Sequence, residues 1–383
     1  MNDPRSGKRK CRVALVGLRF GAAFVPIYRA HPDVELVAIC DSNPQVLADI
    51  GDRFQVERRF DDLDQVLKSE DYDAVHLLTP IPLHARQSVA VLEAAKHCAC
   101  TVPMATSIED LSAIIAAQRR AHKNYMMMET AVYTRAFLFV EEMIGKGELG
   151  RIQFLRGAHY QDMEHWPPYW RGLPPMHYAT HAVSPLLALA RSRATVVHCF
   201  GSGQMREELR AACGNPYPVE VAIFQIEGRE IAAEATRSLF QTARAYTESF
   251  TVYGEKATFE WQQIEEEQPV VFRMEQLPPG ERRPVTASRI AVPDRQDLLP
   301  PQIAPFTQKH LVPGPGPEHP SILQGGGHGG SHPHLVHEFV RSIVEDRKPR
   351  IDAVTAADWT SVGICAHESA MTGGGRVLVP RFD

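Results

Sequence analysis

The chain has 383 residues, of which 44% are apolar and 23% charged, as expected for a soluble globular protein with room for two domains. A formal net charge of −5 gives no reason to expect a nucleic-acid partner. No apolar run is long enough to span a membrane, and the basic N-terminus lacks the apolar core of a signal peptide. We therefore expect a cytoplasmic protein with no membrane partner and a disordered N-terminal tail. The seven cysteines form neither a disulfide framework nor a CxxC pair.

Residues 11–41 have the pattern of a dinucleotide-binding unit. An apolar run from Val13 to Val16 breaks at Gly17, and the chain continues past Gly21 in helical spacing to a second apolar run that ends at Asp41. In such a unit, helix N-terminal amides hold the pyrophosphate, and an acid about twenty residues further on accepts hydrogen bonds from the ribose. Asp41 favours a free 2′-hydroxyl over a 2′-phosphate, so we predict NAD as the cofactor.

The glycine motif is incomplete. Arg19 stands where the second glycine of GxGxxG belongs, and Ala22 takes the place of the third. The side chain of Arg19 begins where the backbone normally approaches the phosphates. Either the turn is wider than usual, or the guanidinium itself contacts the pyrophosphate. An ordinary βαβ unit without a nucleotide is the alternative.

Strands and helices alternate up to residue 130. We expect buried strands over 74–78, 97–102 and 125–128, and helices over 43–54, 61–68 and 84–96 and from Ser107. This alternation predicts a doubly wound parallel sheet, a Rossmann domain over residues 1–130. Its ligands bind at the carboxyl ends of the strands. The predicted cofactor-binding residues are Gly17, Arg19, Phe20, Gly21, Ala22, Asp41, Thr79, Pro80, His84, Thr101, Val102 and Pro103.

Beyond Gly150 the chain changes to short runs of alternating or β-branched residues. Strands are expected over 152–158, 195–200, 220–226, 230–238, 248–253, 257–261 and 270–274. They predict an α/β domain over 131–383 with a large open antiparallel or mixed sheet packed on helices. Prolines are concentrated in 268–333, so most of that segment should be loop, either disordered or functional. Helices are expected over 333–346 and 356–371.

Residues 165–185, HWPPYWRGLPPMHYATHAVSP, form a loop crowded with aromatic, arginine and histidine side chains that leads into a helix near Thr180. Tryptophan and tyrosine rings stack on sugar rings, and arginine and histidine bind hydroxyl groups or anions. Tyr178 and His181 share one face if the helix begins before them. Such a composition is typical of a binding loop, and an aromatic core corner is the alternative.

In the order of its motifs, the chain resembles the Gfo/Idh/MocA oxidoreductase family. The motifs are the glycine turn, TPIPLH at 79–84, CTVPMATSIED at 100–110 and a histidine-bearing helix in the second half. The resemblance covers nearly the whole chain. It implies a Rossmann domain, a tightly held nicotinamide cofactor, and a second domain whose open sheet makes oligomer contacts, so we expect a homodimer or homotetramer.

One departure from the family concerns catalysis. Most of its dehydrogenases carry Glu-Lys-Pro where this chain has Thr101, Val102 and Pro103. That lysine helps to polarise or deprotonate a sugar hydroxyl during hydride transfer, and Val102 can do neither. Either another group performs the acid–base work, or the chain is a binding protein or a degenerate enzyme.

Shorter strings are similar to the NAD-dependent glycosidases of glycoside hydrolase family 109, which also lack the lysine. YATHAVSP at 178–185 resembles YPTHGLGP, residues 126–133 resemble MMxENxxY with Thr130 in place of asparagine, and 327–330 match GHGG. The resemblance implies that Glu129, Tyr178 and His181 take part in catalysis, with His328 near the substrate. A tyrosine of those enzymes falls at either His159 or Tyr160.

The resemblance also implies a redox-neutral hydrolysis. A hydride passes from sugar C3 to NAD⁺, a base removes the acidified C2 proton, the aglycone leaves C1, water adds, and the hydride returns. We expect His181 and Tyr178 around O3 and C2, with Glu129 and either His159 or Tyr160 assisting. The predicted substrate-binding residues are Trp166, Trp170, Arg171, His177, Tyr133 and His328. A sugar dehydrogenase with net NADH formation and a non-catalytic sugar or nucleotide sensor are the alternatives.

Two further hypotheses concern anions and metals. NAD-dependent sulfoquinovosidases also lack the lysine and have a similar build, and Arg171 and His177 beside the two tryptophans can hold a sulfonate or carboxylate. The histidines at 319, 328, 332, 334 and 337 raise the possibility of zinc. They lack an HExxH pattern and a fixed frame, so we predict imidazoles in a sugar pocket and no metal.

Overall fold

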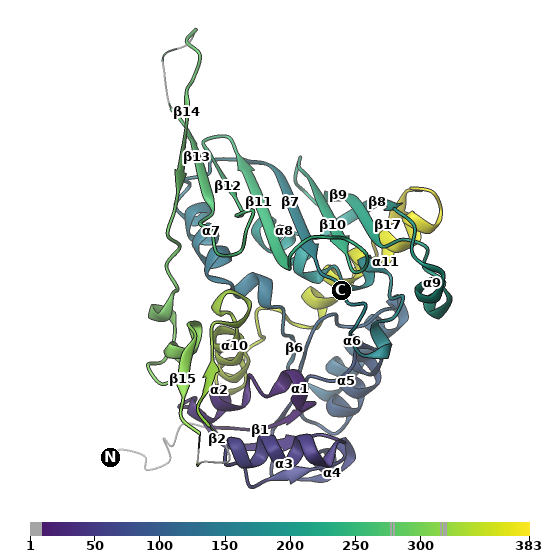
Figure 1. Ribbon diagram of the computed structural model, residues 1–383, viewed down its shortest axis with the longest axis vertical. Coiled ribbons are helices and arrows are strands. Elements are labelled where there is room, and N and C mark those ends of the chain that lie inside the picture. The colour runs from purple at the N-terminus through teal and green to yellow at the C-terminus, as the bar shows by residue number, and fades with distance from the viewer. Residues whose placement is uncertain (1–9, 276–277, 279, 315, 317–319) are drawn as a thin grey trace. The chain divides into compact units, whose positions relative to one another are not determined.

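The computed structural model describes residues 10–275, 278, 280–314, 316 and 320–383 (Figure 1). The predicted disordered tail, apart from Lys10, and His319 lie outside these residues. Contacts divide the chain into two compact units. Unit 1 comprises the described residues of Met1–Ala105, Glu109–Tyr133 and Asp294–Ala356; unit 2 comprises Thr106–Ile108, Thr134–Pro293 and Ala357–Asp383. This grouping differs from the sequence-based limits because the helix α10 (His332–Val344) packs on α2 and β1 of unit 1.

Unit 1 is built on a six-stranded parallel sheet in the order β3-β2-β1-β4-β5-β6, which confirms the predicted Rossmann topology. The central strands β1, β4 and β5 are almost entirely buried, as expected for parallel strands covered on both faces. The strands are β1 (Cys11–Val16), β2 (Val34–Cys40), β3 (Arg59–Phe60), β4 (Ala74–Leu77), β5 (His97–Cys100) and β6 (Tyr125–Met127).

The helices of unit 1 follow the predicted positions with one interruption. They are α1 (Leu18–Gly21), α2 (Val25–Ala30), α3 (Pro44–Arg53), α4 (Leu63–Lys68), α5 (His84–Glu93) and α6 (Ile108–Ala121), with short 3₁₀ turns η1 (Ile81–Leu83), η2 (Thr130–Tyr133), η5 (Gln296–Leu298), η6 (Ala304–Thr307) and η7 (Gly327–Gly330). The helix expected after Gly17 is split into α1 and α2. Pro26 has no N–H for a continuous helix but fits the first turn of a new one.

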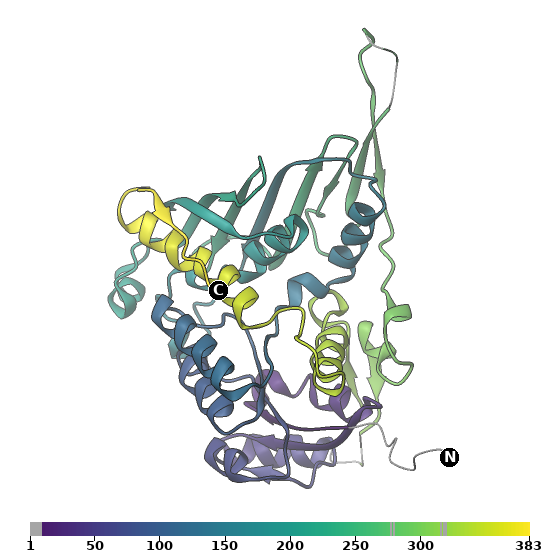
Figure 2. The same ribbon diagram turned by 180° about the vertical axis from the view of Figure 1, so that it is seen from behind.

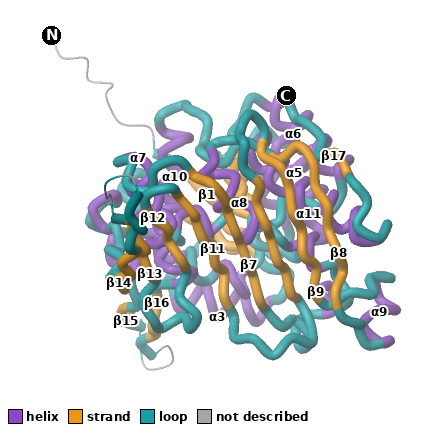
Figure 3. Tube along the Cα trace, turned by 90° about the horizontal axis from the view of Figure 1, so that it is seen from above, coloured by secondary structure: helices purple, strands orange, loops and turns teal. Residues whose placement is uncertain are grey.

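Unit 2 is built on a nine-stranded mixed sheet in the order β14-β13-β12-β11-β7-β10-β9-β8-β17. Figure 3 looks onto these strands, which are antiparallel except for the parallel pair β7 and β10. They are β7 (Ile152–Tyr160), β8 (Ala194–Ser202), β9 (Val219–Ile226), β10 (Ala232–Ser238), β11 (Thr247–Gly254), β12 (Ala257–Glu260), β13 (Val270–Met274), β14 (Val285–Arg289) and β17 (Val377–Leu378). The predicted large open sheet is confirmed.

Helices cover one face of this sheet. They are α7 (Arg135–Gly145), α8 (Thr180–Ala190) and α11 (Ala353–Met371), with α9 (Glu207–Cys213) in a connection and the 3₁₀ turns η3 (Pro168–Trp170) and η4 (Pro175–Tyr178) before α8. The view from behind shows α11 in yellow (Figure 2), and Ser369 of this helix accepts a hydrogen bond from the backbone of Cys199 in β8 at 2.8 Å. Among the described residues, none of the helices has the length and apolarity needed to cross a membrane.

The segment 268–333 is largely irregular, as its prolines predict, but it contains two ribbons. One is β13 paired with β14, which extends the sheet of unit 2. The other is a hairpin of β15 (His310–Val312) and β16 (Ile322–Gln324) in unit 1. The described prolines of these ribbons lie outside the paired strands, because proline cannot donate to the ladder.

Candidate functional site

The predicted cofactor turn lies at the carboxyl end of β1. Gly17 has φ +93°, and a Cβ at this position would lie 2.6 Å from the carbonyl oxygen of Leu78. Its N–H donates to the carbonyl oxygen of Cys40 at the end of β2, at 2.9 Å. Only glycine fits this close approach, and the turn joins the carboxyl ends of the three central strands β2, β1 and β4.

Asp41 lies directly beside this turn. Its carboxylate accepts hydrogen bonds from the backbone N–H of Leu18 at 2.7 Å and of Asn43 at 2.9 Å. Each carboxylate oxygen has a further lone pair, so Asp41 can also accept from ribose hydroxyls. The glycine cradle and the acid at the end of the second strand fit the adenosine half of NAD. Arg19 and Phe20 are exposed at this turn, and the ring of Phe20 lies 6.0 Å from that of His328 and 5.9 Å from that of His332.

His84 ties together the two other loops at this edge of the sheet. Its Nδ1 lies 2.8 Å from the carbonyl oxygen of Pro103, and its Nε2 lies 2.8 Å from that of Thr79. A carbonyl oxygen only accepts, so both ring nitrogens donate and the ring is an imidazolium. Burial acts to lower the pKa of His84, but Cys100 and the two carbonyl oxygens outweigh it and raise the pKa to about 9. Beside this bridge, Val102 is buried and apolar.

A second group of polar side chains gathers in unit 2. The hydroxyl of Tyr178 lies 3.4 Å from Nε2 of His181, and Oε1 of Glu248 lies 3.5 Å from the same nitrogen. Tyr246 donates to Glu248, and the ring of His159 lies 5.1 Å from that of His181. Phenol, imidazole and carboxylate are thus within proton-transfer reach of one another, which is a suitable arrangement for general acid–base chemistry.

Two glycines bring these elements together. A Cβ on Gly157 of β7 would lie 2.0 Å from the carbonyl oxygen of Ala182, so α8 approaches the sheet more closely than any side chain would allow. A Cβ on Gly363 of α11 would likewise lie 2.0 Å from the carbonyl oxygen of Met176 in η4. Tyr178 and His181 are placed by these two close contacts.

Four polar residues form a row across the strands of the same sheet. Glu220 of β9 is in register with Arg237 of β10, Arg237 with His159 of β7, and His159 with Glu248 of β11. The positions two and four residues along these strands on the same face are apolar or glycine, for example Phe250 and Val252 in β11. Arg237, Glu248 and Tyr246 were not predicted. A charged residue that ends an otherwise apolar inward-facing series is the signal that could have found the first two.

The register also separates His159 from Tyr160. His159 lies on the same face of β7 as Gly157 and has ring contacts with Tyr178 and His181. Tyr160 points to the opposite face, where the guanidinium of Arg244 lies 5.9 Å from its ring. Of the two residues left open by the sequence, His159 is the one that joins the Tyr178 group.

The other predicted substrate-binding residues are dispersed. Trp170 packs edge-on against Tyr178 with ring centroids 4.9 Å apart, while Trp166 is 56% exposed. Arg171 is exposed in the same loop. His177 turns to His367, 5.0 Å away, and burial together with His367 lowers its pKa to about 3, so it is neutral at physiological pH.

Three predicted residues belong to unit 1. Glu129 is buried after β6 and accepts a hydrogen bond from the backbone N–H of Ala131 at 2.9 Å. The guanidinium of Arg350 lies 5.6 Å from the ring of Tyr133. His328 occupies η7 with φ +44° and lies near Phe20 of the cofactor turn.

The group of side chains with suitable geometry for a metal ion differs from the histidines considered in the sequence analysis. Among the described residues, His159, His181 and Glu248 offer ligand atoms that all lie within 4.8 Å of one another. The buried guanidinium of Arg237 next to His159 in the row opposes a dication there by repulsion. Of the histidines considered from the sequence, His332 stacks on Phe24 at 4.4 Å and His337 lies 3.0 Å from His31. We keep the prediction of a site without metal.

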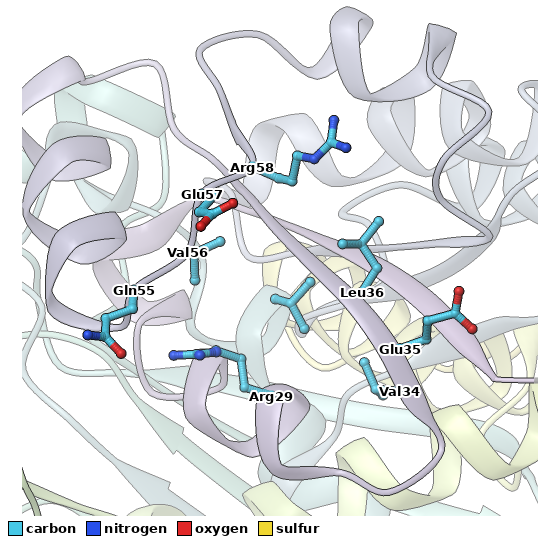
Figure 4. A pocket seen from close by; sticks show the side chains of 9 residues that line it. Arg29, Val34, Glu35, Leu36, Gln55, Val56, Glu57 and Arg58 are labelled. Carbon is cyan, nitrogen blue, oxygen red and sulfur yellow. The ribbon is translucent and has the colours of Figure 1, made fainter.

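A separate cavity of about 520 Å³ opens elsewhere in unit 1 (Figure 4). It is lined by Arg29, Val34–Val37 and Gln55–Arg58. These residues include the first half of β2, whereas Asp41 follows the carboxyl end of that strand. The cavity is therefore distinct from the predicted cofactor site.

The strand order, the glycine cradle and the acid after the second strand define unit 1 as the dinucleotide-binding domain of an oxidoreductase. Residues 11–129 match the Gfo/Idh/MocA model, described as an oxidoreductase family with an NAD-binding Rossmann fold. Over these residues the chain is similar to the Gfo/Idh/MocA oxidoreductase family, as its motifs predicted, and NAD is its cofactor.

Several proteins with similar sequences are named as glycosyl hydrolases. A glycosyl hydrolase family 109 protein of Porphyromonas gingivalis is 27% identical over 197 residues, covering 46% of this chain and 42% of the relative. One from Saccharopolyspora erythraea is 24% identical over 262 residues, covering 60% and 55%. The matched segments thus span only about half of each relative.

Solved structures share the fold along the whole chain. A levoglucosan dehydrogenase in complex with NADH and levoglucosan has a TM-score of 0.74 at 21% identity, covering 97% of this chain and all of the other. An NAD-binding oxidoreductase from Klebsiella pneumoniae has a TM-score of 0.76 at 18% identity, with the same coverage. At these identities the likeness establishes the fold alone.

Proposed function

We propose that the protein is an NAD-dependent glycoside hydrolase that oxidises its sugar transiently at C3 and regenerates its cofactor in each cycle. The observation that carries the proposal is the convergence of Tyr178, Glu248 and His159 on His181. The chain lacks the lysine of the related dehydrogenases and has the buried Val102 in its place. The names of two relatives support hydrolysis over net oxidation.

NAD, when bound, supplies the acceptor and later the donor of a hydride at C3. The protein must take the O3 proton as the hydride leaves, and then the C2 proton that the C3 ketone acidifies. The C1–O bond breaks, and the aglycone oxygen takes up a proton. Water then adds hydroxide to C1 and a proton to C2, and O3 regains its proton as the hydride returns. The products are the free sugar and the aglycone alcohol.

In this proposal the Tyr178 and His181 pair exchanges protons at O3 and C2. The two side chains lie 3.4 Å apart, so a proton taken by one can pass to the other without a solvent molecule. His159 assists, since its ring contacts both. Glu248 faces the same ring nitrogen of His181 and favours its protonated form.

We extend the proposal to the substrate class. Trp170 packs on Tyr178, and Arg171 directly follows Trp170 in the chain, so an anionic group on the sugar, such as the sulfonate of a sulfoquinovoside, can pair with this guanidinium. His177 is neutral at physiological pH and adds at most a hydrogen bond. Replacing Arg171 with Gln should raise KM for a sulfoquinovoside more than for the matching neutral glucoside.

The decisive experiment is hydrolysis of aryl glycosides in D₂O without added NAD, followed by NMR of the sugar product. We expect aglycone release with no net NADH, and deuterium at C2, because the C2 proton leaves and is replaced from solvent. His181→Ala and Tyr178→Phe should each lower kcat/KM by about 10²-fold or more. His198→Ala, at an exposed histidine of β8, is the matched control.

Other outcomes distinguish the alternatives. NADH that accumulates from a free sugar plus NAD⁺, without aglycone release, would identify a sugar dehydrogenase. Hydrolysis without deuterium at C2 would rule out the oxidation–elimination route. Absence of both activities with retained sugar binding would identify a sensor.

A further inference from the structure

Arg237 is a fully buried charged residue beside the Tyr178 group. Its side chain is fully buried, and among the described residues its hydrogen bonds all go to carbonyl oxygens. Nε donates to the backbone carbonyl of Tyr178 at 2.8 Å, and the terminal nitrogens donate to the carbonyls of His159 at 3.1 Å and of Ser238 and to Oε1 of Gln161 at 3.0 Å. Holding three backbone carbonyls with a guanidinium is energetically costly, since its charge must also be desolvated.

The guanidinium also faces the ring of Tyr178, with its central carbon 5.2 Å from the ring centroid. Burial, partly offset by Tyr178, Tyr246 and Glu248, lowers the pKa of Arg237 to about 10. The residue therefore stays charged at neutral pH. An opposite charge close to an acid favours its ionised form, so the buried guanidinium acts to lower the pKa of the Tyr178 phenol.

We propose that Arg237 is a positioning residue that fixes the backbone of Tyr178 and favours its phenolate. The inference rests on the proposed function in that Tyr178 is taken as a proton-exchanging group. Its consequence for the reaction is a base in unit 2 that is partly ionised near neutral pH.

Several other aromatic and titratable side chains surround Tyr178. They are Trp170 of η3, His159 of β7, His181 of α8, Glu248 of β11, and Tyr246 directly before β11. Glu248 is the one carboxylate among them, and its Oε1 already accepts from Tyr246 and faces Nε2 of His181. Arg237 contacts Tyr178 itself, through both backbone and ring, so its charge acts on that residue directly.

The test measures the titration of Tyr178 in the full-length protein without substrate. The tyrosinate absorbance near 295 nm of each variant is compared with that of the same variant carrying Tyr178→Phe. We expect the midpoint for Tyr178 in the natural chain to lie at least one pH unit below that in Arg237→Gln, and Arg237→Lys to restore most of the shift. Arg244→Gln, which removes a guanidinium over Tyr160 on the other face, should leave the midpoint unchanged.

A second readout uses the reaction. The acid limb of the kcat profile should move upward by about one pH unit or more in Arg237→Gln and return in Arg237→Lys. A folded Arg237→Gln with an unchanged Tyr178 midpoint would overturn the inference. If Arg237→Gln does not fold, the natural chain still decides, because a Tyr178 midpoint at or above 10 is incompatible with the proposal. A midpoint that depends on Arg237 in a protein that releases no aglycone would contradict the proposed hydrolysis and leave this inference standing.

Discussion

At the residue scale, two histidines have opposite environments and opposite protonation. His84 donates from both ring nitrogens to carbonyl oxygens, whereas His76 is buried in β4 near the rings of Phe24 and Tyr28 and has its pKa lowered to about 3 by burial. The sequence analysis predicted that His84 binds the cofactor. In the structure, its two ring nitrogens donate to the backbone carbonyl oxygens of Pro103 and Thr79. His84 joins the loop after β4 to the loop after β5.

Because His84 is an imidazolium in the folded protein, we expect unit 1 to lose stability at alkaline pH. The pKa of His84 is about 9 in the folded chain and 6.5 in the unfolded chain. The contribution of His84 to the free energy of unfolding is therefore fully present below pH 6.5 and is lost as pH rises through 9. The loss amounts to about 3 kcal/mol. Chemical unfolding between pH 6 and pH 10 should show this decline in the natural chain, and His84→Gln should be less stable at pH 6 and lack the decline.

Glu248 offers a residue-scale test of the acid–base group. Glu248→Gln keeps the size of the side chain but removes the charge that faces Nε2 of His181. We expect kcat to fall by about tenfold to a hundredfold with little change in KM, because the imidazolium form is less stabilised in the transition state. Glu234→Gln in β10, at an acid that pairs with Arg156 away from this group, is the control. Equal effects in both variants would contradict the role of Glu248.

At the scale of the element, α8 depends on the absence of a side chain at Gly157. Gly157→Ala forces β7 and α8 apart, since its Cβ would lie 2.0 Å from the carbonyl oxygen of Ala182. We expect a destabilisation of about 1–3 kcal/mol and a loss of activity larger than the loss of folded protein, because His181 moves with the helix. Urea unfolding and kcat measured on the folded fraction check this. Gly145→Ala, at the end of α7 with open space around it and no positive φ, is the matched control. Activity that survives in Gly157→Ala would contradict the close approach of α8 to β7.

The elements were predictable to different degrees. The parallel strands of unit 1 are short apolar runs with alternating helices, so both their positions and their class could be read from the sequence. The two-part helix after Gly17 could have been read from Pro26. The row from Glu220 to Glu248 could not be assembled, because register between strands far apart in sequence is set by tertiary packing and not by local pattern.

The candidate site shows the same limit. The sequence predicted that Tyr178 and His181 share one face if the helix begins before them. In the structure α8 begins at Thr180, and the two side chains meet with Tyr178 in the preceding turn η4. Choosing His159 over Tyr160 required knowing which face of β7 meets α8. Arg237 ends the inward-facing series of Ala233 and Ala235, and that signal was overlooked. No sequence pattern reveals that its partners are backbone carbonyls.

At the scale of the whole molecule, buried neutral histidines in both units make the protein sensitive to acid. Burial is the first cause that lowers the pKa of His31 and His334 to about 4 and of His76 and His177 to about 3. Below pH 6.5 the unfolded chain binds protons that these groups in the folded chain do not, so stability falls as pH falls. His76 alone accounts for about 2 kcal/mol between pH 7 and pH 5.

Urea unfolding at pH 7 and pH 5 measures this effect. We expect a lower midpoint at pH 5 in the natural chain and a smaller difference in His76→Phe, which replaces the buried imidazole with an apolar ring of similar size. His165→Phe, at an exposed histidine, should keep the full difference. Equal stability at the two pH values would show that these histidines are protonated in the folded state.

The two glycines that allow α8 and η4 to lie so close to their neighbours have a practical use. In a collection of uncharacterised sequences, the tyrosine–histidine string alone recurs by chance, since it is short. Requiring small, side-chain-free positions corresponding to Gly157 and Gly363 as well would select chains able to seat that string in the same way. Such a filter would rank candidates for screening by spatial feasibility before any substrate is tried.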